Sequence, residues 1–232
     1  MLARRLMMAG GVGGGAEDFS LTFLENPARQ SGSTSETFSG VSFGAAHSGR
    51  VIAVAGMFSG GSGGTQSLTS VTIGGVTATV YSAMRDGGED HGAFIALAAV
   101  PTGTTGDVVV TCSRTLTECE ISTYALRGKS GSVAVYDSDA QAQSGTTTFT
   151  TTLDIPTGGA LLSVQGTNDN HPFTSVSGTA GLSTTDASTD TGLAIYACGS
   201  TESPTAGTGK TVVFNHPAGT CAGASVSVSF EP

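Results

Sequence analysis

The strongest constraint on how this chain can fold is an internal repeat. Four short segments of the first half recur in the same order in the second half, over roughly 80 residues of each. The matched segments are residues 50–56 with 160–166, 68–71 with 173–176, 92–98 with 192–198, and 101–110 with 204–213. Each half then ends in a strand-like segment that begins with a cysteine, Cys119 and Cys221. Self-similarity of this kind indicates that one structural unit is built twice.

The repeated unit is predicted to consist of β-strands. The chain holds 35 Gly among its 232 residues, and Gly, Ser and Thr together exceed a third of it. Gly loses much backbone entropy in a helix, and Ser and Thr offer the backbone competing hydrogen bonds, so helices are disfavoured throughout. From residue 37 onward, short strand-like segments are separated by Gly, Pro, Asn and Asp. That spacing predicts an all-β sandwich or barrel of about a dozen strands.

Two segments predict how strands are covered. Residues 222–230 alternate between apolar side chains and Gly or Ser, so we expect one face in the core and the other in water. Residues 92–100 are apolar at nearly every position, which predicts a central strand covered on both faces. The expected core residues are Ile52, Val54, Val71, Ile95, Leu97, Val109, Ile121, Leu161, Val164, Ile195, Val213, Val226 and Val228.

The repeat leaves open how the two halves combine. They either form two separate sandwiches or interleave as the halves of one jelly roll. The join near residues 128–131 is short and leads directly into the next strand-like segment, which favours a single domain. We therefore expect one jelly-roll β-sandwich over residues 37–232, with similar halves at about 37–128 and 132–232. An extended Gly-rich arm over residues 1–36 would precede it.

The N-terminal arm carries the residues that we expect to mediate assembly. Arg4 and Arg5 are followed by Leu6, Met7 and Met8, and then by a run of glycines. The apolar stretch, residues 6–9, is shorter than the roughly 7 to 15 residues of a signal peptide, so we expect no secretion by that route. A Gly-rich arm has no core of its own and needs another surface to hold it. We expect that surface on a neighbouring subunit; the alternative is an arm folded back along its own domain.

The charge balance argues against two classes of partner. The net charge of −9 would repel the phosphates of nucleic acids, which are bound mainly by Lys and Arg. The longest apolar runs, such as residues 94–100, fall far short of the roughly 20 residues that a membrane helix needs. We therefore expect neither direct nucleic-acid contact nor a membrane partner.

The four cysteines are predicted to form two disulfides. Cys112 and Cys119 flank a short loop and could face each other across a hairpin, and Cys198 and Cys221 would form the second pair. A competing pairing joins Cys119 to Cys221, the positions equivalent under the repeat. The other interpretation is that all four are buried thiols. Zinc is disfavoured because no two cysteines are separated by two to four residues.

The remaining polar residues predict no catalytic or metal site. His47, His91, His171 and His216 are far apart and lie in Gly, Pro or Asp contexts typical of surface loops. The acidic loops Asp86, Glu89 and Asp90, and Asn168, Asp169 and Asn170, lack the ligand spacing of a calcium loop. We expect no enzyme, no cofactor and no metal; a hydrolase would need His91 and Asp86 or similar groups in one pocket.

Several longer segments resemble a known module. They are SVTIGGVTATVYSA (residues 70–83), GAFIALAAVPTGTTGDVVVTC (92–112), ECEISTYALRG (118–128), TTTFTTTLDIPTGGALLSVQG (146–166), GLAIYACGS (192–200) and ASVSVSFEP (224–232). Over residues 37–232 the pattern resembles a jelly-roll module of tailed-bacteriophage structural proteins and some bacterial surface proteins. The Arg-bearing, Met- and Gly-rich start is similar to that of phage minor virion proteins.

The resemblance implies a structural role. The expected function is that of a capsid decoration or other minor virion protein, docked through its N-terminal arm, with capsid, collar or tail proteins and further copies of the chain as partners. It would be assembled in the host cytoplasm and reside in the virion. The alternative is a carbohydrate-binding adhesin module of a phage tail fibre or a bacterial surface, with a host surface glycan as ligand.

Overall fold

All regular elements of the described residues are β-strands. The computed structural model describes residues 19–61, 65–85, 90–128, 133–168, 171, 173–191, 194–216 and 219–232. Every sheet is antiparallel, and the sheets face one another in pairs. The predicted all-β sandwich class is therefore confirmed.

The first half of the chain forms two sheets. Its strands are β1 (Ser20–Glu25), β2 (Ser35–Ser42), β3 (Arg50–Gly60), β4 (Leu68–Ile73), β5 (Val76–Thr77), β6 (Thr79–Arg85), β7 (Asp90–Ala99), β8 (Thr105–Cys112) and β9 (Leu116–Arg127). Inner sheet 1 has the order β1-β9-β3-β7-β6, and outer sheet 1 has the order β2-β8-β4-β5.

The second half repeats this plan. Its strands are β10 (Val135–Thr146), β11 (Thr148–Ile155), β12 (Ala160–Asn168), β13 (Ser175–Ser177), β14 (Ala187–Asp190), β15 (Ala194–Thr201), β16 (Gly207–Asn215) and β17 (Cys221–Phe230). Inner sheet 2 has the order β10-β17-β12-β15-β14, and outer sheet 2 has the order β11-β16-β13. Compared by position across the inner sheets, β10 corresponds to β1, β17 to β9 and β12 to β3.

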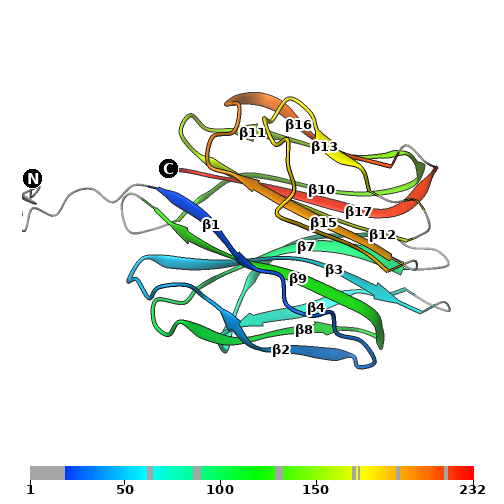
Figure 1. Ribbon diagram of the computed structural model, residues 1–232, viewed down its shortest axis with the longest axis horizontal. Coiled ribbons are helices and arrows are strands. Elements are labelled where there is room, and N and C mark those ends of the chain that lie inside the picture. The colour runs from blue at the N-terminus through cyan, green and yellow to red at the C-terminus, as the bar shows by residue number, and fades with distance from the viewer. Residues whose placement is uncertain are drawn as a thin grey trace, which may run out of the picture.

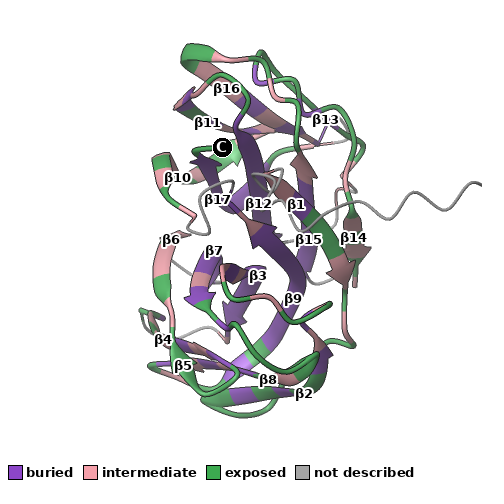
Figure 2. Cartoon of the chain, turned by 90° about the vertical axis from the view of Figure 1, so that its left-hand side faces the viewer, coloured by how far each residue is buried: buried purple, intermediate pink, exposed green. Residues whose placement is uncertain are grey.

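The four sheets stack as layers, with the two inner sheets back to back in the middle (Figure 1). Three apolar cores fill the spaces between them, and the strands nearest the centre are the most completely buried (Figure 2). The first core lies within the first half, the second core within the second half, and the middle core between the inner sheets. Representative members are Phe38, Ile52 and Phe94; Phe149, Leu161 and Phe214; and Ile95, Tyr124 and Val226, respectively.

This stacking corrects the expectation of one interleaved jelly roll. Among the described residues, no sheet contains strands of both halves, so each half closes its own sandwich. The inner sheets face each other with their strand orders reversed. At one side of the stack β6 packs on β10, and at the other side β1 lies against β15.

The start of the folded part also differs from the expectation. Residues 20–25, which the sequence analysis assigns to the arm, form the edge strand β1, and Leu21 and Phe23 pair with Leu126 and Tyr124 of β9. The boundary at residue 36 falls inside β2. The described domain therefore begins near Phe19 rather than at residue 37.

Which residues are buried depends on how the sheets stack and not only on the alternation of apolar and polar residues along each strand. The central strand over residues 92–100 is confirmed, because Phe94 and Ile95 on its two faces are both 0% exposed. The expected wet face of the last strand is wrong: Ser225, Ser227 and Ser229 are each 0% exposed, since outer sheet 2 covers them. Most of the expected core residues are buried, whereas Leu97, Val109 and Val213 are only half-buried.

Several carboxylates accept hydrogen bonds from backbone N–H groups at strand edges and in loops. Asp137 and Asp139 on β10 accept hydrogen bonds from backbone N–H groups of Asp154 and Thr152 on the facing edge of β11, at 2.6 and 2.7 Å. Other carboxylates accept backbone N–H groups in the same way: Glu25, Glu36, Asp90, Asp107, Asp154 and Glu202. Much of the acidic excess is therefore built into the framework.

A buried arginine ties two loops, β2–β3 and β7–β8, to the start of β3. Arg50 is 1% exposed, and its guanidinium donates only to backbone carbonyl oxygens. The acceptors are Val100 at 2.8 Å, Phe43 at 2.9 Å, Gly44 at 3.0 Å, Thr102 at 2.9 Å and Gly103 at 2.8 Å. These bonds use all five N–H donors of the guanidinium.

Candidate functional site: a polar seam between the halves

The densest group of buried polar side chains lies between the inner sheets, along β9. Every second residue of this strand, from Glu118 through Glu120 and Ser122 to Tyr124, is buried. Side chains two residues apart share a face of a strand, and this face is turned toward inner sheet 2. We call the group and its contacts the polar seam: Arg29, Glu118, Glu120, Ser122, Tyr124, Asp186, Thr189, Thr191, Tyr196, Cys198 and Ser200.

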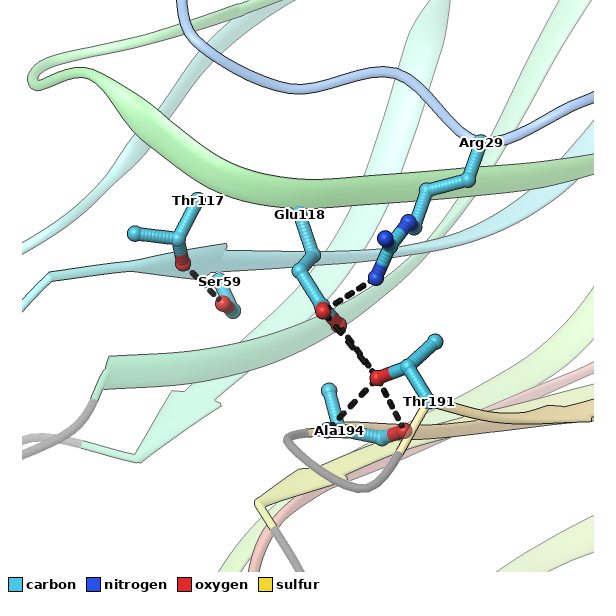
Figure 3. Close-up of polar contacts among 6 residues, drawn as sticks. All are labelled: Arg29, Ser59, Thr117, Glu118, Thr191 and Ala194. Carbon is cyan, nitrogen blue, oxygen red and sulfur yellow. Dashed lines mark hydrogen bonds and ion pairs between the residues drawn. The ribbon is translucent and has the colours of Figure 1, made fainter.

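One end of the seam joins the halves through Glu118. Its carboxylate forms an ion pair with Arg29, and the Thr191 hydroxyl donates to it at 3.0 Å (Figure 3). The same hydroxyl accepts the backbone N–H of Ala194 at 3.1 Å, which ties the contact to the start of β15. Glu118 is only 3% exposed, so this ion pair lies at the margin of the middle core rather than in open solvent.

The carboxylate of Glu120, the next residue on this face, has fewer hydrogen-bond partners than that of Glu118. It is 4% exposed, and its Oε2 has no hydrogen-bond partner among the described residues. Burial raises the pKa of Glu120 and is the largest effect; the hydrogen bond with the Thr189 hydroxyl opposes it, the neighbouring charge of Glu118 raises the pKa further, and Arg29 lowers it. The protonated form is therefore favoured more than in an exposed glutamate.

The other end of the seam gathers hydroxyl and thiol groups around Asp186. The Tyr124 hydroxyl donates to Asp186 at 3.0 Å and lies 3.1 Å from the Cys198 sulfur, and Ser200 donates to Asp186 at 2.6 Å. Burial raises the pKa of Tyr124 and of the Cys198 thiol, so both stay protonated at neutral pH. A thiol held in this form is a poor nucleophile.

The seam can fasten the halves to each other, and its geometry does not favour catalysis. Its two glutamates are 3% and 4% exposed, which keeps a substrate away from both carboxylates. Ser59, opposite Glu118 on β3, is hydrogen-bonded to the Thr117 hydroxyl at 2.6 Å (Figure 3). A nucleophilic serine instead needs a general base within reach of its hydroxyl.

The structure corrects the predicted disulfides: all four cysteines are buried, and none of them forms a disulfide. Cys112 and Cys119 lie on strands of different sheets and face the first core, so the hairpin that would pair them does not exist. Cys198 faces the middle core and Cys221 the second core, on opposite faces of inner sheet 2. The competing pair, Cys119 and Cys221, is separated by both inner sheets.

Two of the four histidines, His91 and His216, differ from the expectation of surface loops. His91 and His216 are 3% and 0% exposed, and the ring nitrogens of His216 contact the His171 carbonyl at 2.9 Å and Gln165 Oε1 at 3.0 Å. Asp90 is buried and accepts the Gln66 N–H at 2.8 Å. Within the described ranges, no three His, Cys, Asp or Glu side chains come together in a way that could hold a metal ion.

Some predicted residues cannot be placed. The assembly residues Arg4, Arg5, Leu6, Met7 and Met8 lie outside the described residues, as do Asp86, Glu89, Asp169 and Asn170. The polar seam was not singled out from the sequence. The available signal was the alternation of Glu118, Glu120, Ser122 and Tyr124 with less polar neighbours, which shows an amphipathic strand but not that a second sheet covers its polar face.

Comparison of the chain with protein-family models, curated proteins and solved structures finds no match. In the part of the chain that the structure describes, no helix is long and apolar enough to cross a membrane.

Replacing Glu120 with glutamine is expected to stabilise the protein at neutral pH by about 1 kcal/mol, because the neutral amide avoids burying an incompletely paired charge. Since the folded-state pKa of Glu120 is raised, its contribution to stability is fully present below the unfolded-state pKa. That contribution is lost as the pH rises through the folded-state pKa. Urea unfolding of Glu120→Gln should therefore show a weaker loss of stability over this pH range than the parent protein.

The matched control is Glu118→Gln on the same strand face. Its charge is paired with Arg29, so this variant should lower the unfolding midpoint at neutral pH. A Glu120→Gln variant less stable than the parent at pH 7 would contradict the role assigned to the Glu120 charge.

Proposed function

We propose that the chain is a structural component of a bacteriophage virion, a capsid decoration or other minor virion protein that docks through its N-terminal residues. In this proposal the two stacked sandwiches form a rigid body that projects from the particle. Its partners are capsid, collar or tail proteins and further copies of the chain. The observation that carries the proposal is the use of buried charge and edge carboxylates for framework contacts.

Edge capping suits a protein present in many copies on one particle. An open sheet edge presents unpaired N–H and C=O groups to any neighbouring edge, and charged side chains placed there discourage pairing between molecules. Asp137 and Asp139 cap β11, while Glu202 of the second half accepts the Leu21 N–H of β1 at 2.6 Å. Crowded copies are thereby directed to specific docking contacts rather than to edge pairing.

The order of the strands supports the jelly-roll part of the proposal. In each half the first strand lies beside the last, β1 beside β9 and β10 beside β17. Between these two strands the chain crosses repeatedly between the inner and the outer sheet, and among the described residues only β4–β5, β6–β7 and β14–β15 are consecutive strands of one sheet. This winding agrees with the module that the sequence resembles, in two copies rather than one.

The test is deletion of residues 1–18. Tagged full-length and shortened chains are supplied during production of phage particles from the genome that encodes the protein, and the tag is quantified in gradient-purified particles. We expect at least a tenfold loss of incorporation, since the deleted residues include the basic and apolar docking residues Arg4 to Met8. The unfolding midpoint should stay unchanged, because the described domain begins at Phe19.

Two controls make the result specific. A chain with Arg4 and Arg5 replaced by serine keeps the length of the segment and tests whether charge contributes to docking. Full incorporation of the shortened chain would overturn docking through the arm. Reproducible, selective binding of the purified protein on a glycan array would instead favour the adhesin alternative.

A further inference from the structure

The second core contains a polar island that its own side chains do not satisfy. Gln165 and Thr167 on β12 and Ser225 on β17 are each 0% exposed and face outer sheet 2. Each has one polar atom without a hydrogen-bond partner among the described residues: Gln165 Nε2, Thr167 Oγ1 and Ser225 Oγ. Buried polar groups are nearly always paired, with protein or with ordered water.

The three groups are neighbours on one face of inner sheet 2. Gln165 lies directly opposite Ser225 in the β12–β17 ladder, and Thr167 is two residues along the same face. Cross-strand neighbours have Cβ atoms about 5 Å apart, and residues two apart on a strand are about 7 Å apart. The residue opposite Thr167 is Gly223, which has no side chain that could pair with the Thr167 hydroxyl.

The residues around the polar island shield it from solvent. The His216 ring contacts Gln165 Oε1 at 3.0 Å, and Phe149 packs edge-on against that ring, with 5.7 Å between ring centroids. His216 and Phe149 are both 0% exposed. A group that pairs with the island must therefore be small enough to reside inside the core.

The adjacent polar row shows what direct pairing looks like in the same core. Ser227 lies 2.5 Å from the Thr151 hydroxyl and 2.7 Å from the Ser163 hydroxyl, so these three side chains satisfy one another. Gln165 Nε2, Thr167 Oγ1 and Ser225 Oγ form no such bonds with one another, although they lie in the same strands and are equally buried. The difference calls for a bridging group with both donor and acceptor capacity.

We propose that this island is a binding site for a buried water molecule. Its oxygen accepts the Gln165 Nε2–H, and it exchanges hydrogen bonds with the Thr167 and Ser225 hydroxyls. Three partners are typical of a buried water. The water completes the hydrogen bonding of β12 and β17 at the level of His216, and its enclosure makes its exchange with solvent slow.

The first experiment uses the unmodified protein. Water ¹⁷O relaxation dispersion counts waters that reside in the protein much longer than surface waters, and a high-resolution crystal structure locates them. We expect a long-lived water and a density peak within hydrogen-bond distance of all three side chains. A crystal structure with an empty island would overturn the proposal.

The second experiment uses the double variant Thr167→Val and Ser225→Ala. If the water is present, the variant loses the corresponding relaxation amplitude, and its ratio of folded to unfolded protein falls about 5- to 10-fold. If the groups are dry, removing them raises that ratio, which would contradict the proposal. The matched control is Ser227→Ala, which removes directly paired contacts and should lower stability without changing the count of long-lived waters.

Discussion

Replacing Arg50 with alanine is expected to lower the free energy of unfolding by about 4 kcal/mol, the largest effect of any single substitution considered. The side chain is 1% exposed and donates to carbonyls of two loops, the β2–β3 loop at Phe43 and Gly44 and the β7–β8 loop at Val100, Thr102 and Gly103. Its removal leaves these acceptors without their donor and opens a cavity at the start of β3. Equilibrium unfolding in urea measures the loss.

Two further variants separate the hydrogen bonds from the charge. Arg50→Lys keeps the charge, but an ammonium group has three donors and lacks the planar fork, so most of the loss should remain, about 2 to 3 kcal/mol. Arg127→Ala is the matched control, since Arg127 lies opposite Arg50 in the ladder and is only half-buried. It should cost less than about 1 kcal/mol. Equal losses at both positions would show that the loop contacts of Arg50 contribute little.

Replacing Gly166 with alanine is expected to destabilise the protein by about 2 to 3 kcal/mol, through overpacking between the inner sheets. A Cβ atom at this position would lie 2.5 Å from the Gly92 carbonyl oxygen and 2.6 Å from Met57 Cβ. The first of these neighbours is backbone and cannot rotate away. Relief therefore requires the two halves to move apart, which loosens the middle core. Urea unfolding at constant pH measures the loss.

The control for this substitution is Gly61→Ala. There the nearest heavy atom to an added Cβ is Thr117 Cγ2 at 3.6 Å, an ordinary contact distance. Any general effect of exchanging Gly for Ala should appear in both variants, and the clash only at Gly166. A Gly166→Ala variant as stable as Gly61→Ala would mean that the inner sheets do not approach each other as closely as described.

The order of the repeated segments could be predicted, but their register could not. The alignment of the two repeats makes Ile52 equivalent to Leu162. In the structure, however, Ile52 faces the first core and Leu162 faces the middle core. A shift of one residue along a strand exchanges its faces. The alignment is wrong by one residue because the face of β12 that points into the second core carries the polar residues Ser163, Gln165 and Thr167. The apolar residues of β3 that face the first core were therefore aligned with the apolar residues of β12 that face the middle core.

The first strand was missed although a signal for it exists. Gln-Ser-Gly occurs at residues 30–32, after β1, and at residues 143–145, at the end of β10. Gly32 and Gly145 both have positive φ angles, 104° and 65°, which favour glycine at these turns. Extending the repeat to this motif would have placed a strand before residue 30. The boundary between arm and domain was predicted too late in the chain because the Gly-rich residues before β1 suggested that the arm extends to residue 36.

The polar seam could not be predicted for a different reason. Glu118 and Glu120 have the alternation of a half-exposed strand, and only the stacking of the second half covers them. The partner that donates to Glu118 is Thr191, 73 residues away in the chain. Contacts of this kind depend on how two sheets meet, which strand periodicity does not encode.

The back-to-back packing of the two halves has a consequence for how stability depends on concentration. If the same sandwiches were separate chains, dilution would dissociate them by mass action. Here the short connection at residues 128–133 holds the second inner sheet close to the first, with an effective local concentration on the order of millimolar or above. Docking of the halves is thus unimolecular, so that closure of the middle core does not depend on the protein concentration.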